Sequence, residues 1–132
     1  MDLPDLKGAI SSFYRILKEK AVAVLIFSLP AFPQGKSTKI GSRKQVSYQW
    51  DFSYFEQRRC TDPPWAHFKN DFIWFHRPLS DYWKVFKSAG FEVTEFEEPR
   101  LTLPNKDTMI DPEKLNNCQT RPYSVAFKLN KQ

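Results

Sequence analysis

Several residue types that mark common functional sites are scarce in this sequence. Only four of the 132 residues are glycine, which leaves little material for a glycine-rich loop that cradles phosphate. The two cysteines, Cys60 and Cys118, have no CxxC spacing and no pair of histidines nearby. We therefore expect free thiols and no metal site.

Long apolar runs and targeting segments are also missing. The longest apolar run, residues 21–29, is about half of the ~20 residues that a membrane-spanning helix needs. The amino terminus has no basic stretch followed by an apolar core and a small-residue cleavage site, so it does not resemble a signal peptide. We expect a cytosolic protein with no membrane partner.

Acidic residues are fewer than basic ones. The sequence has 20 Lys and Arg residues against 15 Asp and Glu residues, for a formal net charge of +5. This balance allows nucleic-acid binding, but the basic residues are mostly scattered. The densest basic run, residues 36–44, is interpreted as a solvated loop. Nucleic-acid binding is therefore our third functional hypothesis, and we expect no nucleic-acid partner.

Aromatic residues are abundant by contrast. Twelve Phe, five Tyr and four Trp make up 16% of the chain, and such rings either fill a core or line an apolar binding surface. The length suits one domain with one core, so we predict a single domain over residues 1–132.

The first part of this domain, residues 1–30, predicts a helix and a buried strand. Apolar residues recur every three or four positions between residues 3 and 17, with Asp2 and Pro4 suited to the first turn. Residues 22–29 form a continuous apolar run typical of a strand covered on both faces. A helix that leads into such a strand is half of a parallel α/β unit, and we find no strand pattern before it.

The middle part, residues 31–75, is interpreted as an aromatic-rich insertion or lid. A polar loop is followed by the segments QWDFSYF (49–55) and DFIWF (71–75). Their alternation suits short strands or a lid across a cleft.

The last part, residues 76–132, predicts a helix, a strand, a long loop and a terminal strand. The helix begins near Leu79 with Ser80 as its cap and ends before Gly90. The strands cover residues 91–98 and 123–129, and a short helix is expected over 111–117.

Three segments, in order, resemble the carboxy-terminal half of class I S-adenosylmethionine-dependent methyltransferases. They are FYRILKEKAVAVLIFSLPAF (13–32), HRPLSDYWKVFKSAGF (76–91) and RPYSVAFKLNK (121–131). The resemblance implies an α/β fold, namely a partial Rossmann-like methyltransferase fold. Its small mixed sheet would have about three strands with flanking helices, and the terminal strand would lie antiparallel between residues 22–29 and 91–98.

The resemblance implies S-adenosylmethionine as the cofactor and a small-molecule methyl acceptor. The family's glycine-rich loop and the acidic residue that ends its second strand have no counterpart in this sequence. These parts hold the cofactor through backbone amides and a carboxylate. We therefore expect no cofactor binding by this chain alone.

Candidate substrate-binding residues follow from position. Ligands in open α/β sheets bind beyond the carboxyl ends of the parallel strands, which makes Ser28, Pro30 and Phe32 candidates. The alternative is that they merely end a strand. His76 is a candidate general base, because its pKa lies near neutrality. The resemblance places His76 and Arg77 at the mouth of the substrate cleft, although His76 could instead only stabilise the following helix.

Four aromatic residues of the insertion could form an apolar wall for the acceptor, namely Tyr54, Phe55, Trp65 and Trp74. Ordinary core packing is the alternative for all four. The first functional hypothesis is thus the substrate-side portion of a methyltransferase, with residues 22–29 as an exposed edge for a homo-oligomer or a partner chain. The second is a non-enzymatic binding module derived from the same fold.

Overall fold

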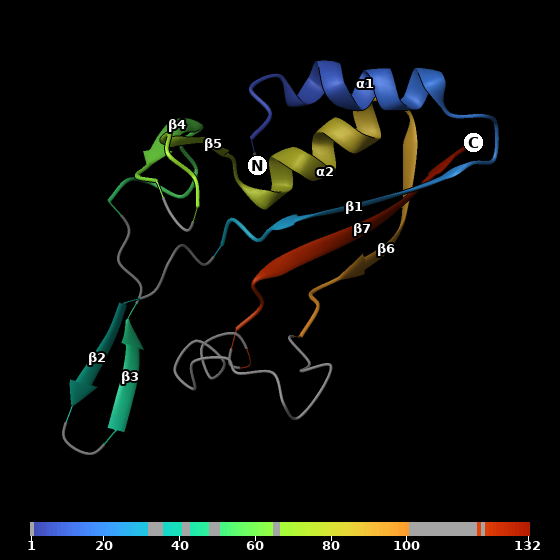
Figure 1. Cartoon of the computed structure of the whole chain (residues 1–132). Coiled ribbons are helices and arrows are strands. Elements are labelled where there is room, and N and C mark those ends of the chain that lie inside the picture. The colour runs from blue at the N-terminus through green and yellow to red at the C-terminus, as the bar shows by residue number, and fades with distance from the viewer. Residues whose placement is uncertain are drawn as a thin grey trace.

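The computed structural model describes residues 2–31, 36–40, 43–47, 51–64, 67–100, 119 and 121–132. The helix expected over 111–117, together with Phe32, Trp65 and Cys118, lies outside them. The elements in chain order are α1 (Leu6–Ile16), β1 (Val22–Ser28), β2 (Lys36–Ile40), β3 (Arg43–Ser47), β4 (Arg58–Asp62), β5 (Phe72–His76), α2 (Leu79–Ser88), β6 (Phe91–Glu97) and β7 (Ser124–Lys131). Figure 1 shows α1 and α2 beside the sheet of β1, β7 and β6, and the two hairpins near the end where β1 finishes.

The main sheet confirms the predicted strand order. Its order is β1-β7-β6, and β7 is antiparallel to both neighbours. The outer strands β1 and β6 therefore run in the same direction, so their carboxyl ends lie at the same end of the sheet. The fold is mixed α/β, as expected.

The core lies between one face of this sheet and the two helices. The register aligns Leu25 of β1 and Phe96 of β6 with Phe127 of β7, so these three residues share that face. The Phe127 ring lies 5.2 Å from that of Phe86 and 5.1 Å from that of Phe96. The buried hydrophobic residues are Leu6, Ile10, Phe27, Leu29, Tyr82, Phe86, Phe91, Val125, Phe127 and Leu129.

The prediction that β1 is covered on both faces is wrong. Its residues alternate, and Val22, Val24 and Ile26 are 49%, 60% and 66% exposed. Both helices contribute to the core on the opposite face, so no described helix covers these three side chains. A continuous apolar run therefore marks a strand whose second face is open in this chain.

The helix ends differ from the predictions in their details. Helix α1 begins later than expected, because the Asp5 carboxylate accepts a hydrogen bond from the Gly8 amide (2.8 Å) and caps it. Helix α2 begins at Leu79 as predicted, but Pro78 and not Ser80 is at its N-cap position. Gly90 has the predicted positive φ (+100°), and a Cβ there would lie 3.0 Å from the Tyr14 ring.

The insertion forms two hairpins. The interpretation of residues 36–44 as a loop is wrong, because β2 and β3 pair antiparallel. They carry the branched residues Ile40 and Val46, which favour strands. The second hairpin pairs β4 with β5. Residues 71–75, predicted as a short strand or part of a lid, overlap β5, whereas residues 51–55 of the other aromatic segment form no strand. The partner strand β4 has no apolar alternation that could have predicted it.

Candidate functional site

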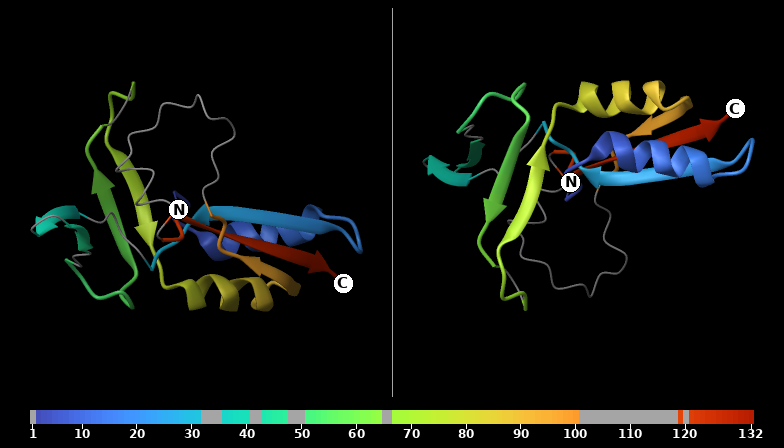
Figure 2. Two further views of the ribbon diagram at one scale, coloured as in Figure 1. Left: turned by 90° about the horizontal axis from the view of Figure 1, so that it is seen from below. Right: turned by 90° about the horizontal axis from the view of Figure 1, so that it is seen from above.

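The candidate site lies at the end of the main sheet where β1 and β6 finish. The β4–β5 hairpin lies beyond this end in both views of Figure 2, and β5 leads directly into α2. This is the end at which open α/β sheets bind ligands. The sequence-predicted residues that gather there are Tyr54, Trp74, His76 and Arg77.

His76 is buried and oriented by the backbone. It is 3% exposed, and its Nε2 lies 2.8 Å from the Tyr54 carbonyl oxygen. Because a carbonyl oxygen only accepts, Nε2 is the donor in this contact. The rings of Phe52 and Tyr54 stand edge-on to the imidazole at 5.1 Å and 5.6 Å.

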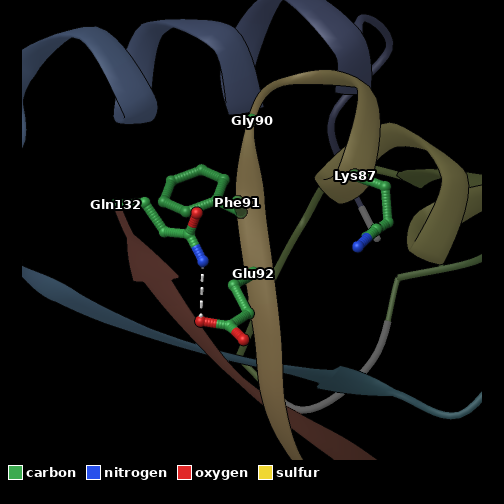
Figure 3. Close-up of a pocket in the computed structure, with 5 residues that line it drawn as sticks. All are labelled: Lys87, Gly90, Phe91, Glu92 and Gln132. Atoms are coloured by element: carbon green, nitrogen blue, oxygen red, sulfur yellow. Dashed lines mark hydrogen bonds between the residues drawn. The ribbon is translucent and has the colours of Figure 1, made fainter.

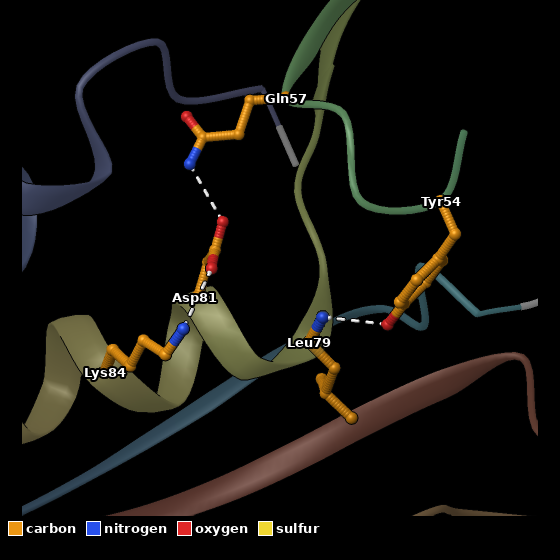
Figure 4. A network of polar contacts seen from close by, with 5 residues as sticks. All are labelled: Tyr54, Gln57, Leu79, Asp81 and Lys84. Carbon is orange, nitrogen blue, oxygen red and sulfur yellow. Dashed lines mark hydrogen bonds and ion pairs between the residues drawn. The ribbon is translucent and has the colours of Figure 1, made fainter. Parts of the chain in front are cut away.

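Tyr54 joins the aromatic segment to α2. Pro78 provides no side-chain cap, and the Leu79 amide instead donates to the Tyr54 hydroxyl at 2.9 Å. In the same first turn, Gln57 Nε2 donates to Asp81 Oδ2 (2.8 Å), and Lys84 Nζ lies 3.9 Å from Asp81 Oδ1. Figure 4 shows these contacts along the first turns of the helix. They fix residues 54–57 against the amino end of α2.

Arg77 joins the amino-terminal segment to the same junction. It is 8% exposed, its Nη2 donates to the Pro4 carbonyl oxygen (2.6 Å), and its guanidinium lies 5.5 Å from the Phe75 ring centre. Burial raises the pKa of the neighbouring Tyr82 hydroxyl above its usual value of 10.0, while a hydrogen bond and the charge of Arg77 oppose this shift.

Two buried donors at this junction have no acceptor. Within the described part of the chain, Nη1 of Arg77 and Nε1 of Trp74 make no hydrogen bond. Buried polar groups in folded proteins are nearly always paired, so each is a position where a ligand oxygen could bind. Trp74 is on β5, whereas Arg77 is the residue that follows the end of this strand.

The other predicted site residues are less enclosed. Phe55 is 79% exposed and contacts the Tyr54 ring edge-on at 5.3 Å. Ser28 is exposed and Pro30 half-buried at the carboxyl end of β1, while Phe32 and Trp65 lie outside the described residues. The structure thus brings part of the predicted wall together around His76.

The sequence did not predict a shallow apolar cavity of about 320 Å³ that the structure contains. It lies between α2 and β6 and is lined by Leu79, Ser80, Trp83, Phe96 and Phe127. Trp83 and Phe96 are each 44% exposed, so both rings are open to a ligand on one side. Because β6 contributes Phe96 near its carboxyl end, this cavity opens at the same end of the sheet as His76.

A second cavity, of about 220 Å³, lies at the opposite end of β6. Lys87, Gly90, Phe91, Glu92 and Gln132 line it, and Gln132 Nε2 donates to Glu92 Oε2 at 3.1 Å (Figure 3). It is remote from the carboxyl ends of the strands. We therefore do not assign it to the candidate site.

At the carboxyl end of β1, two backbone positions offer no free amide to a ligand. The Leu29 amide already donates to the Tyr123 carbonyl oxygen (3.0 Å), Pro30 has no N–H, and this turn has no carboxylate. Free amides and a carboxylate are what a nucleoside cofactor needs at a strand end. Within the described residues no group of three or more His, Cys, Asp or Glu side chains could hold a metal ion, and no helix there is long and apolar enough to cross a membrane.

Comparisons with known proteins connect this arrangement to one fold. No family profile and no curated protein sequence matches the chain. Its structure is similar to one assigned as an S-adenosylmethionine-dependent methyltransferase from Listeria monocytogenes, with a TM-score of 0.72 and 17% identity over 99% of this chain. It is also similar to an S-adenosylmethionine-dependent methyltransferase from Mesorhizobium loti, with a TM-score of 0.68 and 12% identity over 98% of this chain. The chain spans 56% and 57% of those two proteins, so it has part of a methyltransferase fold.

Proposed function

We propose that this chain is the carboxy-terminal, substrate-side portion of an S-adenosylmethionine-dependent methyltransferase that acts on a small molecule. The observation that carries the proposal is the sheet order β1-β7-β6 with the terminal strand antiparallel in the middle. The likeness to part of two methyltransferase structures supports it. Residues 1–132 form one domain in this proposal, with residues 31–75 as the insertion beside the cleft.

The residues of the candidate site have separate roles toward the methyl acceptor. Methyl transfer needs alignment of the acceptor above all, and in some cases a base. Tyr54 and Trp74 provide apolar surface, and the Arg77 guanidinium binds an acceptor oxygen. His76 is the base toward the acceptor, and the contact of its Nε2 with the Tyr54 carbonyl oxygen orients the ring. Ser28 and Pro30 border the same end of the sheet.

The chain does not catalyse alone in this proposal, because its sequence has no counterpart of the family's glycine-rich loop or of the acidic residue that ends the family's second strand. A cofactor-binding portion completes the site by pairing with β1, whose outer edge has no partner strand among the described residues. This portion is either a second copy or another chain. We place the protein in the cytosol, where thiols such as that of Cys60 stay reduced.

Calorimetric titration with S-adenosylmethionine and S-adenosylhomocysteine tests this proposal. We expect no heat of binding from the chain alone, and light scattering is expected to reveal self-association or capture of a partner. Micromolar cofactor binding by the isolated chain would overturn the missing-cofactor argument. A monodisperse monomer that binds no partner would count against the substrate-side role.

A non-enzymatic binding module is the second candidate, and the apolar cavity beside Trp83 is the observation that favours it. The cavity needs no cofactor to bind an apolar ligand. A thermal-shift screen with apolar ligands separates the two functions. The module predicts shifts that Trp83→Ala abolishes and His76→Gln leaves unchanged, whereas the methyltransferase predicts methyl transfer that requires His76 once the partner is present.

A further inference from the structure

The β2–β3 hairpin carries most of the excess charge of this protein. Lys36, Lys39, Arg43 and Lys44 lie on its two strands, and the sequence has no acidic residue between Glu19 and Asp51. The other 16 basic residues are nearly balanced by 15 acidic ones. The net charge of +5 is therefore concentrated on one two-stranded ribbon.

The register of the ribbon places two of these cations against each other. Lys39 and Lys44 are direct cross-strand partners, and like charges at such positions destabilise a hairpin. Lys36 and Arg43 belong to the opposite face, because strand residues alternate. Each face thus has two cationic positions, and an anion bound at the face of Lys39 and Lys44 would relieve the repulsion between them.

The apolar positions and the two-stranded shape of the ribbon favour one class of polyanion as its ligand. The apolar positions Ile40 and Val46 belong to opposite faces of the ribbon, so neither face is the apolar one that insertion into a bilayer surface requires. A two-stranded ribbon fits the major groove of B-form DNA, with phosphates on both sides. The corresponding groove of duplex RNA is too narrow. The ribbon stands apart from the main sheet in the views of Figures 1 and 2.

We propose that the β2–β3 hairpin is an arm that binds double-stranded DNA through its phosphates, without sequence preference. This inference stands apart from the proposed methyltransferase role and needs neither cofactor nor partner. It also replaces the expectation from the sequence that the chain has no nucleic-acid partner. That expectation relied on a solvated loop, which the hairpin pairing contradicts.

Fluorescence anisotropy with a labelled random-sequence duplex of about 20 base pairs tests the proposal through its salt dependence. Four phosphate contacts predict a slope of log K against log salt of about −3.5, so affinity falls roughly 100-fold between 50 and 200 mM salt. The variant K36Q/K39Q/R43Q/K44Q should lose this binding. The control K7Q/K18Q/K69Q/K87Q removes the same charge from exposed positions elsewhere and should keep it.

A single substitution separates DNA binding from hairpin folding. Lys39→Glu turns the Lys39–Lys44 pair into an attractive one, so it should stabilise the hairpin and yet weaken DNA binding at least tenfold. Unchanged or tighter binding by this variant would overturn the proposal. So would equal losses in the two quadruple variants, or no binding at 50 mM salt. Stronger binding to phosphatidylserine vesicles or to a polyglutamate peptide than to the duplex would also refute it.

Discussion

Replacing Val24 and Ile26 with lysine tests whether the open face and edge of β1 form an interface. Val22, Val24 and Ile26 are 49%, 60% and 66% exposed, so roughly half of each side chain is left for a partner to cover. Full burial of such a side chain stabilises by about 2 kcal/mol. Covering the remaining parts of all three therefore contributes about 3.5 kcal/mol, or roughly 300-fold in the association constant.

We expect the double variant V24K/I26K to lose most of this association. Strand β1 has no charged residue. The two lysines would therefore place unpaired charges in the interface, and burying an unpaired charge is costly. Sedimentation equilibrium of the wild type and the variant at several concentrations measures the difference. Ile16→Lys is the matched control, because Ile16 is 69% exposed on α1 and lies away from the β1 edge.

Two outcomes would refute this reasoning. A wild-type chain that stays monomeric at high concentration and in the presence of a candidate partner would show that the face is simply solvated. Equal loss of association in the Ile16→Lys control would show a nonspecific apolar effect. The other outer strand, β6, is not expected to form this interface in place of β1. It carries Glu92, Glu95 and Glu97, and its pairing with β7 has a register shift between Val93 and Glu95. Such features protect a strand edge from pairing.

Three further predictions concern stability. Tyr54→Phe removes the acceptor of the Leu79 amide and should cost about 1 kcal/mol, or roughly 3 °C in Tm, measured by thermal unfolding. Gly90→Ala should cost roughly 1–3 kcal/mol in urea unfolding, because φ is +100° and the new Cβ would lie 3.0 Å from the Tyr14 ring. The pKa of Tyr82 is higher in the folded state than its usual value of 10.0, so its contribution to stability is complete below pH 10.0. This contribution is lost as the pH rises through the folded-state pKa. Tyr82→Phe should therefore reduce the fall in the free energy of unfolding at alkaline pH, measured by urea unfolding at several pH values.

One control serves both tyrosine predictions. Tyr123 is 58% exposed, so Tyr123→Phe should change neither the Tm nor the alkaline pH dependence. An effect of Tyr54→Phe no larger than that of this control would contradict the capping role. An alkaline profile identical in wild type and Tyr82→Phe would contradict the folded-state shift. A Gly90→Ala variant as stable as wild type would show that the turn can adopt another conformation.

The candidate site could be predicted only in part. His76 and Arg77 were predicted from the resemblance to methyltransferases, and Tyr54 and Trp74 because they belong to aromatic segments. The cavity beside Trp83 had no such signal. Phe96 and Phe127 lie far apart in the sequence, and only the β6–β7 register brings them together. The hydrogen bond from His76 to the Tyr54 carbonyl likewise spans 22 residues.

The sequence by itself determined the local elements of this protein. Periodicity of 3.6 gave α1 and α2, apolar runs and alternation gave β1, β6 and β7, and Gly90 gave the turn between α2 and β6. Tertiary structure alone decided which faces are covered. Residues 22–28 are apolar on both sides, and nothing in their local pattern reveals that the two helices share one face and leave Val24 and Ile26 exposed. Cross-strand pairing likewise made a hairpin of residues 36–47, because hydrogen bonds between strands depend on register rather than on composition.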